Sequence, residues 1–404
     1  MLIELIIALL IGILAGTFTG LAPGIHINLI STILIASLST VPFLNTISPI
    51  ALAIFITSMA ITHSFLDFIP SIYLGAPDED SFLSVLPGHQ LLKQGRGHEA
   101  VILTLQGSLT ALIIIIVFIP IFIFILPAIH QSLTQILPFV LIFASLYLIL
   151  REQEFLISLT VFILAGFLGL ITFNLPVKEP LLPLLTGLFG ASALIISLKT
   201  ESQKLTKQKI TKIKDIKLTK KQFLKSSLAA SISAPLCSFL PGIGSGHAAV
   251  IASEIHETDA RSFLFLVGAI NTIVIALSFI TVYSINKTRS GAAVAVKEIL
   301  KSISIQDLTA ITATIFISGI LSFIIGIKIS KIVAKNINKA SYKLLSIITL
   351  IILLGVNLIF SNLLGILVLI TSTSLGIFTI LSNSRRINLM AALLIPTIVF
   401  YLTI

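Results

Sequence analysis

Two short segments place Pro-Gly and polar residues inside otherwise apolar sequence, and these are the residues best suited to chemistry. The first reads Gly20-Leu-Ala-Pro-Gly-Ile-His-Ile-Asn28, and the second reads Phe239-Leu-Pro-Gly-Ile-Gly-Ser-Gly-His247. Proline removes a backbone donor and glycine permits positive φ, so a helix that enters either segment ends there. The helix that restarts presents free N–H groups and a partial positive charge, which attract an anion. The residues assigned to this anion site are Pro23, Gly24, His26, Asn28, Pro241, Gly242, Gly244, Ser245 and His247.

Each break also has a plainer interpretation. A single Pro-Gly in an apolar segment is most simply a kink, or a loop between two spanning helices. Two copies at equivalent places favour a functional role, because irregular backbone at membrane depth is tolerated only beside protein or a water-filled cavity. His26 and His247 are equally well explained as neutral donors packed against helix ends.

The elements that must position these residues are transmembrane helices. Of the 404 residues, 56% are hydrophobic and 10% are charged, whereas a soluble domain has about 25% charged residues. No Asp, Glu, Lys or Arg occurs in residues 5–66, 100–150, 155–177, 180–198, 226–253, 262–286, 308–327, 344–384 or 387–404. One crossing needs about 20 apolar residues, so these stretches supply about ten crossings. The composition excludes an ordinary cytosolic enzyme and predicts an all-α, polytopic protein of the cell membrane.

A basic linker divides the chain into two similar halves. Residues 199–225 hold ten Lys and two acidic residues, so the predicted domains are a first transmembrane repeat over 1–198, this linker, and a second repeat over 226–404. Each half consists of one Pro-Gly-broken hairpin and five candidate crossings. These lie near 46–66, 100–127, 133–150, 155–173 and 180–198, and near 262–285, 306–328, 343–361, 363–382 and 387–404.

The number of crossings decides how the halves are oriented. Whether a hairpin is re-entrant or spans the membrane twice, each half crosses an odd number of times. The second half is then inverted relative to the first, as in many secondary transporters. The positive-inside rule places the linker in the cytoplasm and both termini outside. This accounts for the net charge of +10 without a nucleic-acid partner, and leaves anionic lipid headgroups as a partner for the linker.

Catalytic motifs are absent or incomplete. The pair His98-Glu99 is followed by Ile102 where a zinc-protease helix has its second His. Gly244-Ser245-Gly246 resembles an intramembrane serine-protease motif, but the preceding Gly that this motif requires is Ile243. We therefore expect a protein that is not an enzyme and that needs no cofactor beyond a coupling Na⁺ or H⁺.

The long polar connection Asp67–Glu99 is the second feature of interest, because irregular segments of this length are usually functional or disordered. Its acidic run Asp78–Asp80 is most simply a solvated surface. Arg96 is interpreted either as an anion contact or as a positive-inside anchor.

These motifs resemble one known family. The paired Pro-Gly breaks, the stretch Pro87-Gly-His-Gln-Leu-Leu-Lys-Gln-Gly-Arg-Gly97 and the helix Glu99–Ser108 are similar to the large membrane subunit (TctA) of tripartite tricarboxylate transporters, in its shorter, archaeal-type, stand-alone form. The resemblance implies ion-driven uptake of carboxylates, with a small membrane subunit and an extracytoplasmic binding protein as partners. It also implies a binding role for Pro70, after which Ser71 stands where the family has Gly.

We therefore expect a secondary transporter that binds a small di- or tricarboxylate between the two helix N-termini near the membrane midplane. The first break is also similar to that of polyprenyl-phosphate translocases, so a lipid-carrier phosphate is the alternative substrate, and an intramembrane enzyme is less well supported. The coupling-ion candidates are Asn28, Ser245, Asp67 and Glu254. Sodium held by backbone carbonyls is favoured over histidine protonation, because the sequence places no carboxylate in mid-membrane. The sequence is also compatible with a homo-oligomer.

Overall fold

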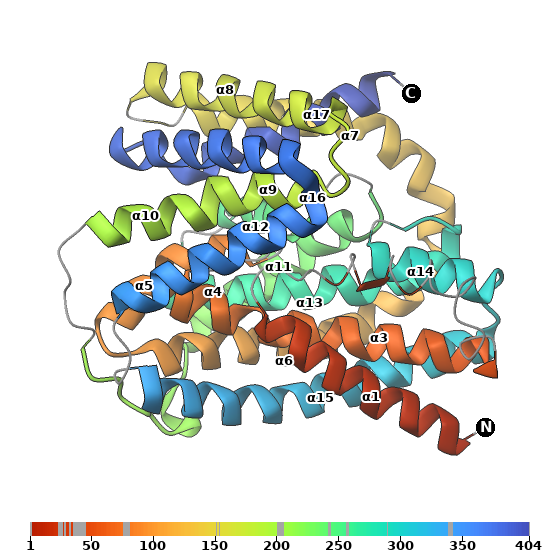
Figure 1. Cartoon of the computed structure of the whole chain (residues 1–404). Helices are drawn as coiled ribbons and strands as arrows, with labels where there is room; N and C mark the ends of the chain where they lie inside the picture. Colours follow the sequence, from red (N-terminus) through yellow and green to blue (C-terminus); the bar gives the residue numbers. More distant parts are fainter. Residues whose placement is uncertain are drawn as a thin grey trace.

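The computed structural model of the protein is helical throughout the part of the chain that it describes (Figure 1). The described residues are 2–22, 27, 30–31, 34, 46–75, 81–150, 152, 154–199, 206–240, 244–255, 258–288, 290–337 and 342–403. Within them, seven helices are long and apolar enough to cross a membrane, or eight if the bent α7 (Leu126–Leu150) counts as one span. The predicted all-α, multi-pass architecture is confirmed.

The helix bounds follow the predicted crossings closely. The first half contains α1 (Leu2–Leu21), α3 (Pro49–Leu66), α4 (Phe68–Leu74), η2 (Phe82–Ser84), α5 (Val85–Lys93), α6 (Gly97–Phe124), α7, α8 (Phe155–Asn174), α9 (Leu181–Leu185), the π-helix η3 (Thr186–Ala191) and α10 (Ser192–Lys199). The second half contains α11 (Lys220–Phe239), α12 (Ser245–Ile255), α13 (Ala260–Ile285), α14 (Gly291–Leu300), α15 (Ile305–Asn336), α16 (Tyr342–Leu381), η6 (Arg386–Met390) and α17 (Ala391–Thr403). Asn362, with φ of 63°, interrupts α16 at the boundary between two predicted crossings.

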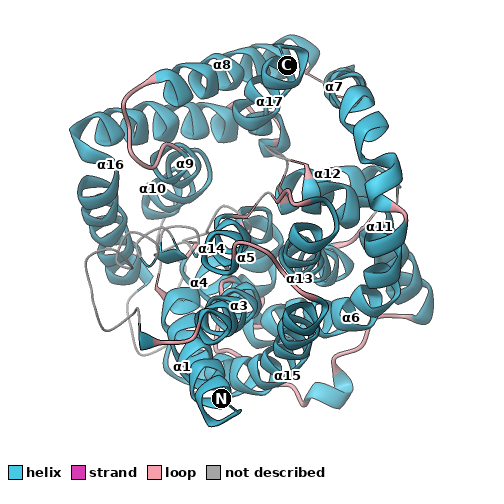
Figure 2. Ribbon diagram, turned by 90° about the vertical axis from the view of Figure 1, so that its right-hand side faces the viewer, coloured by secondary structure: helices cyan, strands magenta, loops and turns pink. Residues whose placement is uncertain are grey.

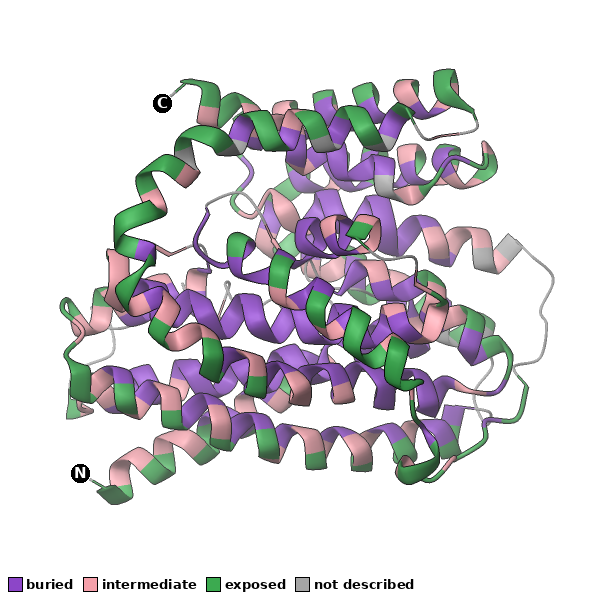
Figure 3. Ribbon diagram, turned by 180° about the vertical axis from the view of Figure 1, so that it is seen from behind, coloured by how far each residue is buried: buried purple, intermediate pink, exposed green. Residues whose placement is uncertain are grey.

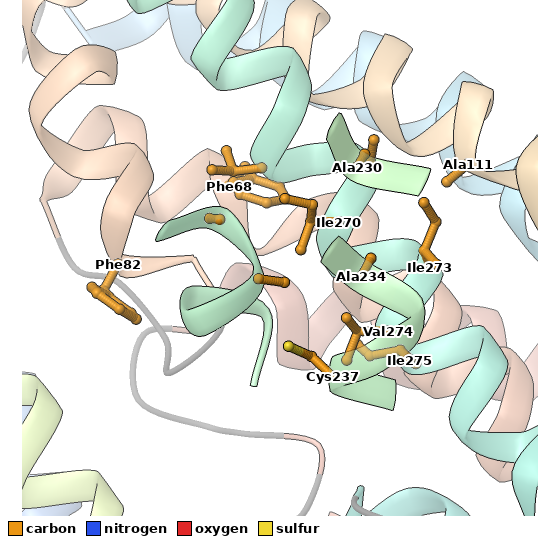
Figure 4. Close-up of a cluster of buried hydrophobic side chains, with 14 of the residues drawn as sticks. Phe68, Phe82, Ala111, Ala230, Ala234, Cys237, Ile270, Ile273, Val274 and Ile275 are labelled. Carbon is orange, nitrogen blue, oxygen red and sulfur yellow. The ribbon is translucent and has the colours of Figure 1, made fainter. Parts of the chain in front are cut away.

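The centre of the molecule is a bundle formed by α1, α3, α6, α11, α13 and α15, which we call the core bundle (Figure 2). Helices α3 and α13 are buried along almost their whole length (Figure 3). Figure 4 shows Ala234 and Cys237 of α11 beside Val274 of α13. Side chains this small let two helices approach closely, and close packing is what holds helices together in lipid.

Glycines set the closest approaches in the core bundle. A Cβ atom on Gly107 of α6 would lie 2.0 Å from the carbonyl oxygen of Phe265, and one on Gly268 of α13 would lie 2.2 Å from that of Thr104. Ser108 donates a hydrogen bond to the Gly268 carbonyl across the same contact, at 3.0 Å. The α6–α13 crossing therefore depends on bare backbone at two positions.

The remaining long helices form a second group, the outer layer, made of α7, α8, α9–η3–α10, α16 and α17 (Figure 2). Within it α17 packs on α8, and α16 packs on the α9–η3–α10 segment. Many large apolar side chains on α1, α7, α8 and α16 are exposed, as on Phe143, Phe167 and Ile359. Exposed apolar faces of this size are expected where a helix meets lipid.

Helix contacts occur in matching pairs, some within one half of the chain and some between the halves. Helix α3 packs on α15, and α13 packs on α6; α1 contacts α3 and α15, and α11 contacts α13 and α6; α14 lies on α3, and α5 lies on α13. In the outer layer, α8 meets α17 and α10 meets α16. Each half thus contributes corresponding helices to both groups, and the core is shared between the halves.

The described part of the linker lies against the core bundle. The Gln208 side chain accepts a hydrogen bond from the Gly97 N–H at 2.9 Å and donates one to the Leu92 carbonyl at 3.0 Å. The Lys209 N–H donates to the Gly95 carbonyl, and Gln106 donates to the Ile216 carbonyl. Figure 1 shows both termini on the right, whereas the linker lies at the lower left.

Candidate functional site

The structure describes one of the two predicted breaks in part. Pro23, Gly24, His26 and Asn28 of the first break lie outside the described residues, as do Pro241 and Gly242 of the second. The helix that restarts after the second break is described from Gly244 onward, and it carries Ser245 and His247 as predicted. The site is therefore built from this end of α12.

The start of α12 is buried and ordered by its own side chains. Ser245 and His247 are 2% and 3% exposed. The Gly244 N–H donates a hydrogen bond to Nδ1 of His247 at 3.1 Å, so Nδ1 is an acceptor and the neutral imidazole carries its proton on Nε2. His247 thus packs against the start of its own helix, where its Nδ1 accepts the Gly244 N–H. The first turn of α12 still directs N–H groups without intrahelical partners toward its N-terminal side.

Helices α11 and α12 pack against each other, and the start of α11 lies close to the residue that precedes α13. Gln222, in the first turn of α11, donates a hydrogen bond to Asp259, the residue that precedes α13, at 3.2 Å. Helix α12 has 11 residues, which span about 17 Å of the roughly 30 Å apolar core of a bilayer. Leu240, which ends α11, and Gly244, which precedes α12, are therefore at the opposite end of this helix pair from Gln222 and Asp259.

Aromatic rings connect the start of α12 to the outer layer. A Cβ atom on Gly246 would lie 2.7 Å from the Phe82 ring and 3.2 Å from the end of the Met390 side chain. Phe82 in turn stacks on Phe189 of η3, with ring centroids 4.2 Å apart. Figure 4 shows Phe82 apart from the tightly packed α11–α13 contact. The second break thus lies between the core bundle and the outer layer.

The structure places Pro70 and Ser71 close to this contact. Both are buried in α4, and the Ser71 hydroxyl forms a hydrogen bond with that of Ser81 at 2.7 Å. Ser81 directly precedes Phe82, whose ring covers Gly246. The connection Asp67–Glu99 therefore reaches the second break through η2, whereas its acidic run Asp78–Asp80 lies outside the described residues.

Asp67 is a buried carboxylate at an unexpected depth. It is 3% exposed, and its Oδ2 accepts a hydrogen bond from Nδ2 of Asn271 at 3.0 Å. Asn271 is fully buried near the middle of α13, and Asp67 itself lies within the candidate span Pro49–Leu74. Asp67 directly follows the charge-free run 5–66, and the structure buries it at the α3–α4 junction beside Asn271.

Glu254 does not join these residues. It lies half-buried in the last turn of α12, about 13 Å along the helix from Ser245 at 1.5 Å per residue. Arg96 is also separate from the site, because it forms an ion pair with Glu99. Arg261 pairs with the same carboxylate at 2.8 Å. Arg96 is thus part of a helix-end ion-pair network.

Two residues of interest were not found from the sequence as site candidates. Asn271 is an isolated amide in the charge-free run 262–286, and that position alone is a signal of function. Arg386 follows the charge-free run 344–384 directly after Arg385, and its guanidinium donates hydrogen bonds to the η3 carbonyls. Among the described residues no group of three His, Cys, Asp or Glu could hold a metal ion.

The fold and this site together define a multi-pass membrane protein in which a buried helix end lies between two groups of helices. A family model described as "Tripartite tricarboxylate transporter TctA family" matches residues 6–391. The chain belongs to this family, which is a family of transporters and not of enzymes, and the resemblance found from the sequence motifs is confirmed.

The chain is also similar to an uncharacterized protein, MJ1079, of the archaeon Methanocaldococcus jannaschii. The two are 33% identical over 401 residues, which cover 96% of each chain. No solved structure matches. Family membership therefore supports a secondary transporter of the tricarboxylate type.

Proposed function

We propose that the protein imports small di- or tricarboxylates, driven by a cation gradient. The observation that carries this proposal is the buried start of α12, where helix N–H groups, Ser245 and His247 meet between the core bundle and the outer layer. Carboxylate oxygens are suited to such a helix end, because they accept hydrogen bonds and carry negative charge. The first break, at Pro23-Gly24, is proposed to supply the second half of the site.

We propose further that the two halves are inverted repeats with re-entrant Pro-Gly hairpins. The matching contacts between the halves and the short α12 support this arrangement. A cation-coupled transporter of this kind exposes its site alternately by moving one group of helices against the other. The site lies where these groups meet, so such a motion would open it to either side. The linker is placed in the cytoplasm and the termini outside.

Asp67 is the proposed coupling residue. Asp67 is 3% exposed within the candidate span Pro49–Leu74, and an ionisable side chain at such a place is a candidate ligand for a coupling Na⁺ or H⁺. The Asn271 amide fixes the orientation of the carboxylate. Ser245 and Asn28 are kept as further sodium ligands in the proposal, whereas the position of Glu254 argues for a role outside the site.

Uptake into proteoliposomes tests the proposal. Radiolabelled citrate and succinate are offered under an inward Na⁺ gradient at fixed pH, and then under a proton gradient without sodium. Gradient-dependent accumulation of either compound is the expected result, and the Asp67→Asn variant should lose it. The Glu254→Gln variant is the matched control and should retain uptake.

Two outcomes contradict the proposal. Absence of gradient-dependent uptake for every small carboxylate would favour a polyprenyl phosphate as the substrate. Unchanged, gradient-dependent uptake in the Asp67→Asn variant would remove Asp67 from the coupling step. In a tripartite system a TctA subunit works with a small membrane subunit and an extracytoplasmic binding protein, so the assay is repeated with such subunits if the stand-alone protein is inactive.

A further inference from the structure

Arg386 lies at the start of η6, yet its guanidinium reaches the middle of another helical segment. Its Nη2 donates hydrogen bonds to the carbonyl oxygens of Leu188, at 3.1 Å, and of Phe189. Both residues belong to the π-helix η3, near the middle of the segment Leu181–Lys199. A π-helix leaves carbonyls without their usual partners and is common at functional sites. The positive charge of Arg386 is thereby held beside the middle of this segment.

The charge of Arg386 is not neutralised by the described residues. Its neighbours among the described residues are the η3 carbonyls, the Ser192 hydroxyl at 3.4 Å and the Phe189 ring at 5.3 Å. Its Nε is buried and makes no hydrogen bond within the described part of the chain. No described carboxylate forms an ion pair with it. A charge placed in this way inside a membrane protein normally pairs with an opposite charge.

The other arginines of the described chain with ion pairs provide a contrast. Arg385, the preceding residue, pairs with Glu152 at 2.5 Å and is 48% exposed. Arg96 and Arg261 share Glu99. Arg386 thus differs from its sequence neighbour Arg385, because no acidic residue in the described part of the chain pairs with it.

Two aromatic rings connect Arg386 to the start of α12. Phe189, which lies under the guanidinium, stacks on Phe82, and the Phe82 ring covers Gly246. Met390, from the same short helix as Arg386, touches the same glycine position. Burial and the charges of Lys93 and Arg386 lower the pKa of His89 to about 4, so this histidine stays neutral and contributes no competing charge near neutral pH.

We propose that Arg386 binds one carboxylate group of the substrate, while the N-terminus of α12 binds another. The carbonyls of η3 hold Nη2 and orient the guanidinium plane, and the buried Nε–H has no acceptor within the described part of the chain. Arginine suits this role because its planar donors match a carboxylate. The site then selects compounds with two or more carboxylates over monocarboxylates. This inference rests on the proposed carboxylate transport.

Uptake of succinate, citrate and acetate by proteoliposomes that contain Arg386 variants tests this role. The Arg386→Gln variant should lower kcat/KM for succinate and citrate about 10- to 100-fold, as expected when a charged hydrogen bond is lost. Arg386→Lys, which keeps the charge but not the planar fork, should fall between it and the wild type. Arg385→Gln is the matched control and should stay within about twofold of the wild type, because exposed ion pairs contribute little.

The outcomes separate this inference from the proposed function. If the wild type accumulates succinate and Arg386→Gln does so with unchanged KM, Arg386 only caps η3 and the inference is overturned, while carboxylate transport stands. Equal use of acetate and succinate by the wild type also overturns it. If the wild type accumulates no carboxylate, the proposed function itself fails.

Chemical modification of the wild type covers the case in which Arg386→Gln does not fold. Phenylglyoxal modifies accessible guanidinium groups, and mass spectrometry distinguishes Arg386 from Arg385. Succinate should slow modification of Arg386 but not of Arg385. Equal rates at Arg386 with and without succinate overturn the inference. Protection by inorganic phosphate but not by succinate overturns it in favour of a phosphate site.

Discussion

The Asp259 side chain holds the second hairpin to the helix that follows it. As the N-cap of α13 it accepts hydrogen bonds from the N–H and the hydroxyl of Ser262, and it also accepts one from Gln222 of α11. Burial alone would raise its pKa, but these hydrogen bonds and the charge of Arg261 hold the pKa of Asp259 below its ordinary value of 3.8. Its ionised form is therefore favoured by folding.

The lowered pKa of Asp259 in the folded protein predicts how stability depends on pH. A carboxyl group with a lowered pKa in the folded state stabilises the protein above its unfolded pKa, and this contribution is lost as the pH falls through the folded pKa. We expect the thermal unfolding temperature in detergent to fall between about pH 5 and about pH 3 less steeply in Asp259→Asn than in the wild type. Parallel curves for the two proteins would contradict this assignment.

At the residue scale, sequence reasoning found the polar groups that follow the second break but missed their partners. Ser245 and His247 could be predicted, because Pro-Gly marks where a helix restarts. The contact of Gly246 with Phe82, and that of Arg386 with η3, join segments that are more than a hundred residues apart. No local pattern encodes such contacts, so only the folded structure brings these groups together.

At the element scale, charge-free runs predicted the long helices well, since a helix in lipid must be apolar along its whole length. The broken α16 is an example, because the sequence separates its two parts at Asn362. The short helices α5 and α14 were not predicted, as each covers a longer helix instead of crossing the membrane. Helix α1 shows a further signal, the spacing of Gly12, Gly16 and Gly20, which places three glycines on one face.

This glycine face predicts a cost for any larger side chain. A Cβ atom on Gly16 would lie 2.4 Å from the Met59 carbonyl oxygen and 2.7 Å from Cβ of Thr62, so α1 would have to move away from α3. Gly16→Leu should therefore lower the free energy of unfolding by about 1–3 kcal/mol, measured by thermal unfolding in detergent. Gly355→Leu is the control, since nothing lies within 4 Å of its added Cβ atom, and it should leave stability unchanged. Equal stability of the two variants would count against a close α1–α3 contact.

The linker segment that contains Gln208 should behave as part of the bundle. One buried side chain satisfies the Gly97 N–H and the Leu92 carbonyl, and its removal leaves both groups without this partner. Gln208→Ala should cost about 1–3 kcal/mol locally and speed trypsin cleavage at Lys207 and Lys209. Gln94→Ala, on an exposed site nearby, is the control and should cleave at the wild-type rate. Cleavage at the same rate in both variants would show that the linker is not held by Gln208.

At the scale of the whole molecule, the core belongs to both halves of the chain. The most buried helix of the second half, α13, packs against α6 of the first half, and α3 packs against α15 in the same manner. If one half of the chain were alone in the membrane, polar groups such as Asn271 and bare glycine backbone would face lipid. Lipid offers neither of them a substitute partner. Neither half is therefore a folding unit by itself.

This shared core predicts the behaviour of a chain cut within the linker. Fragments 1–200 and 201–404, each expressed alone, should aggregate in detergent, because α6 and α13 each lose the surface that covers their glycines. Co-expressed fragments should co-purify on a tag placed on either one and elute at the size of the intact chain, since the cut removes one covalent link but no helix contact. The hydrogen bonds of Gln208 to Gly97 and Leu92 then join the fragments across the cut. Monodisperse, thermally stable separate halves would contradict a shared core and would imply two independent domains.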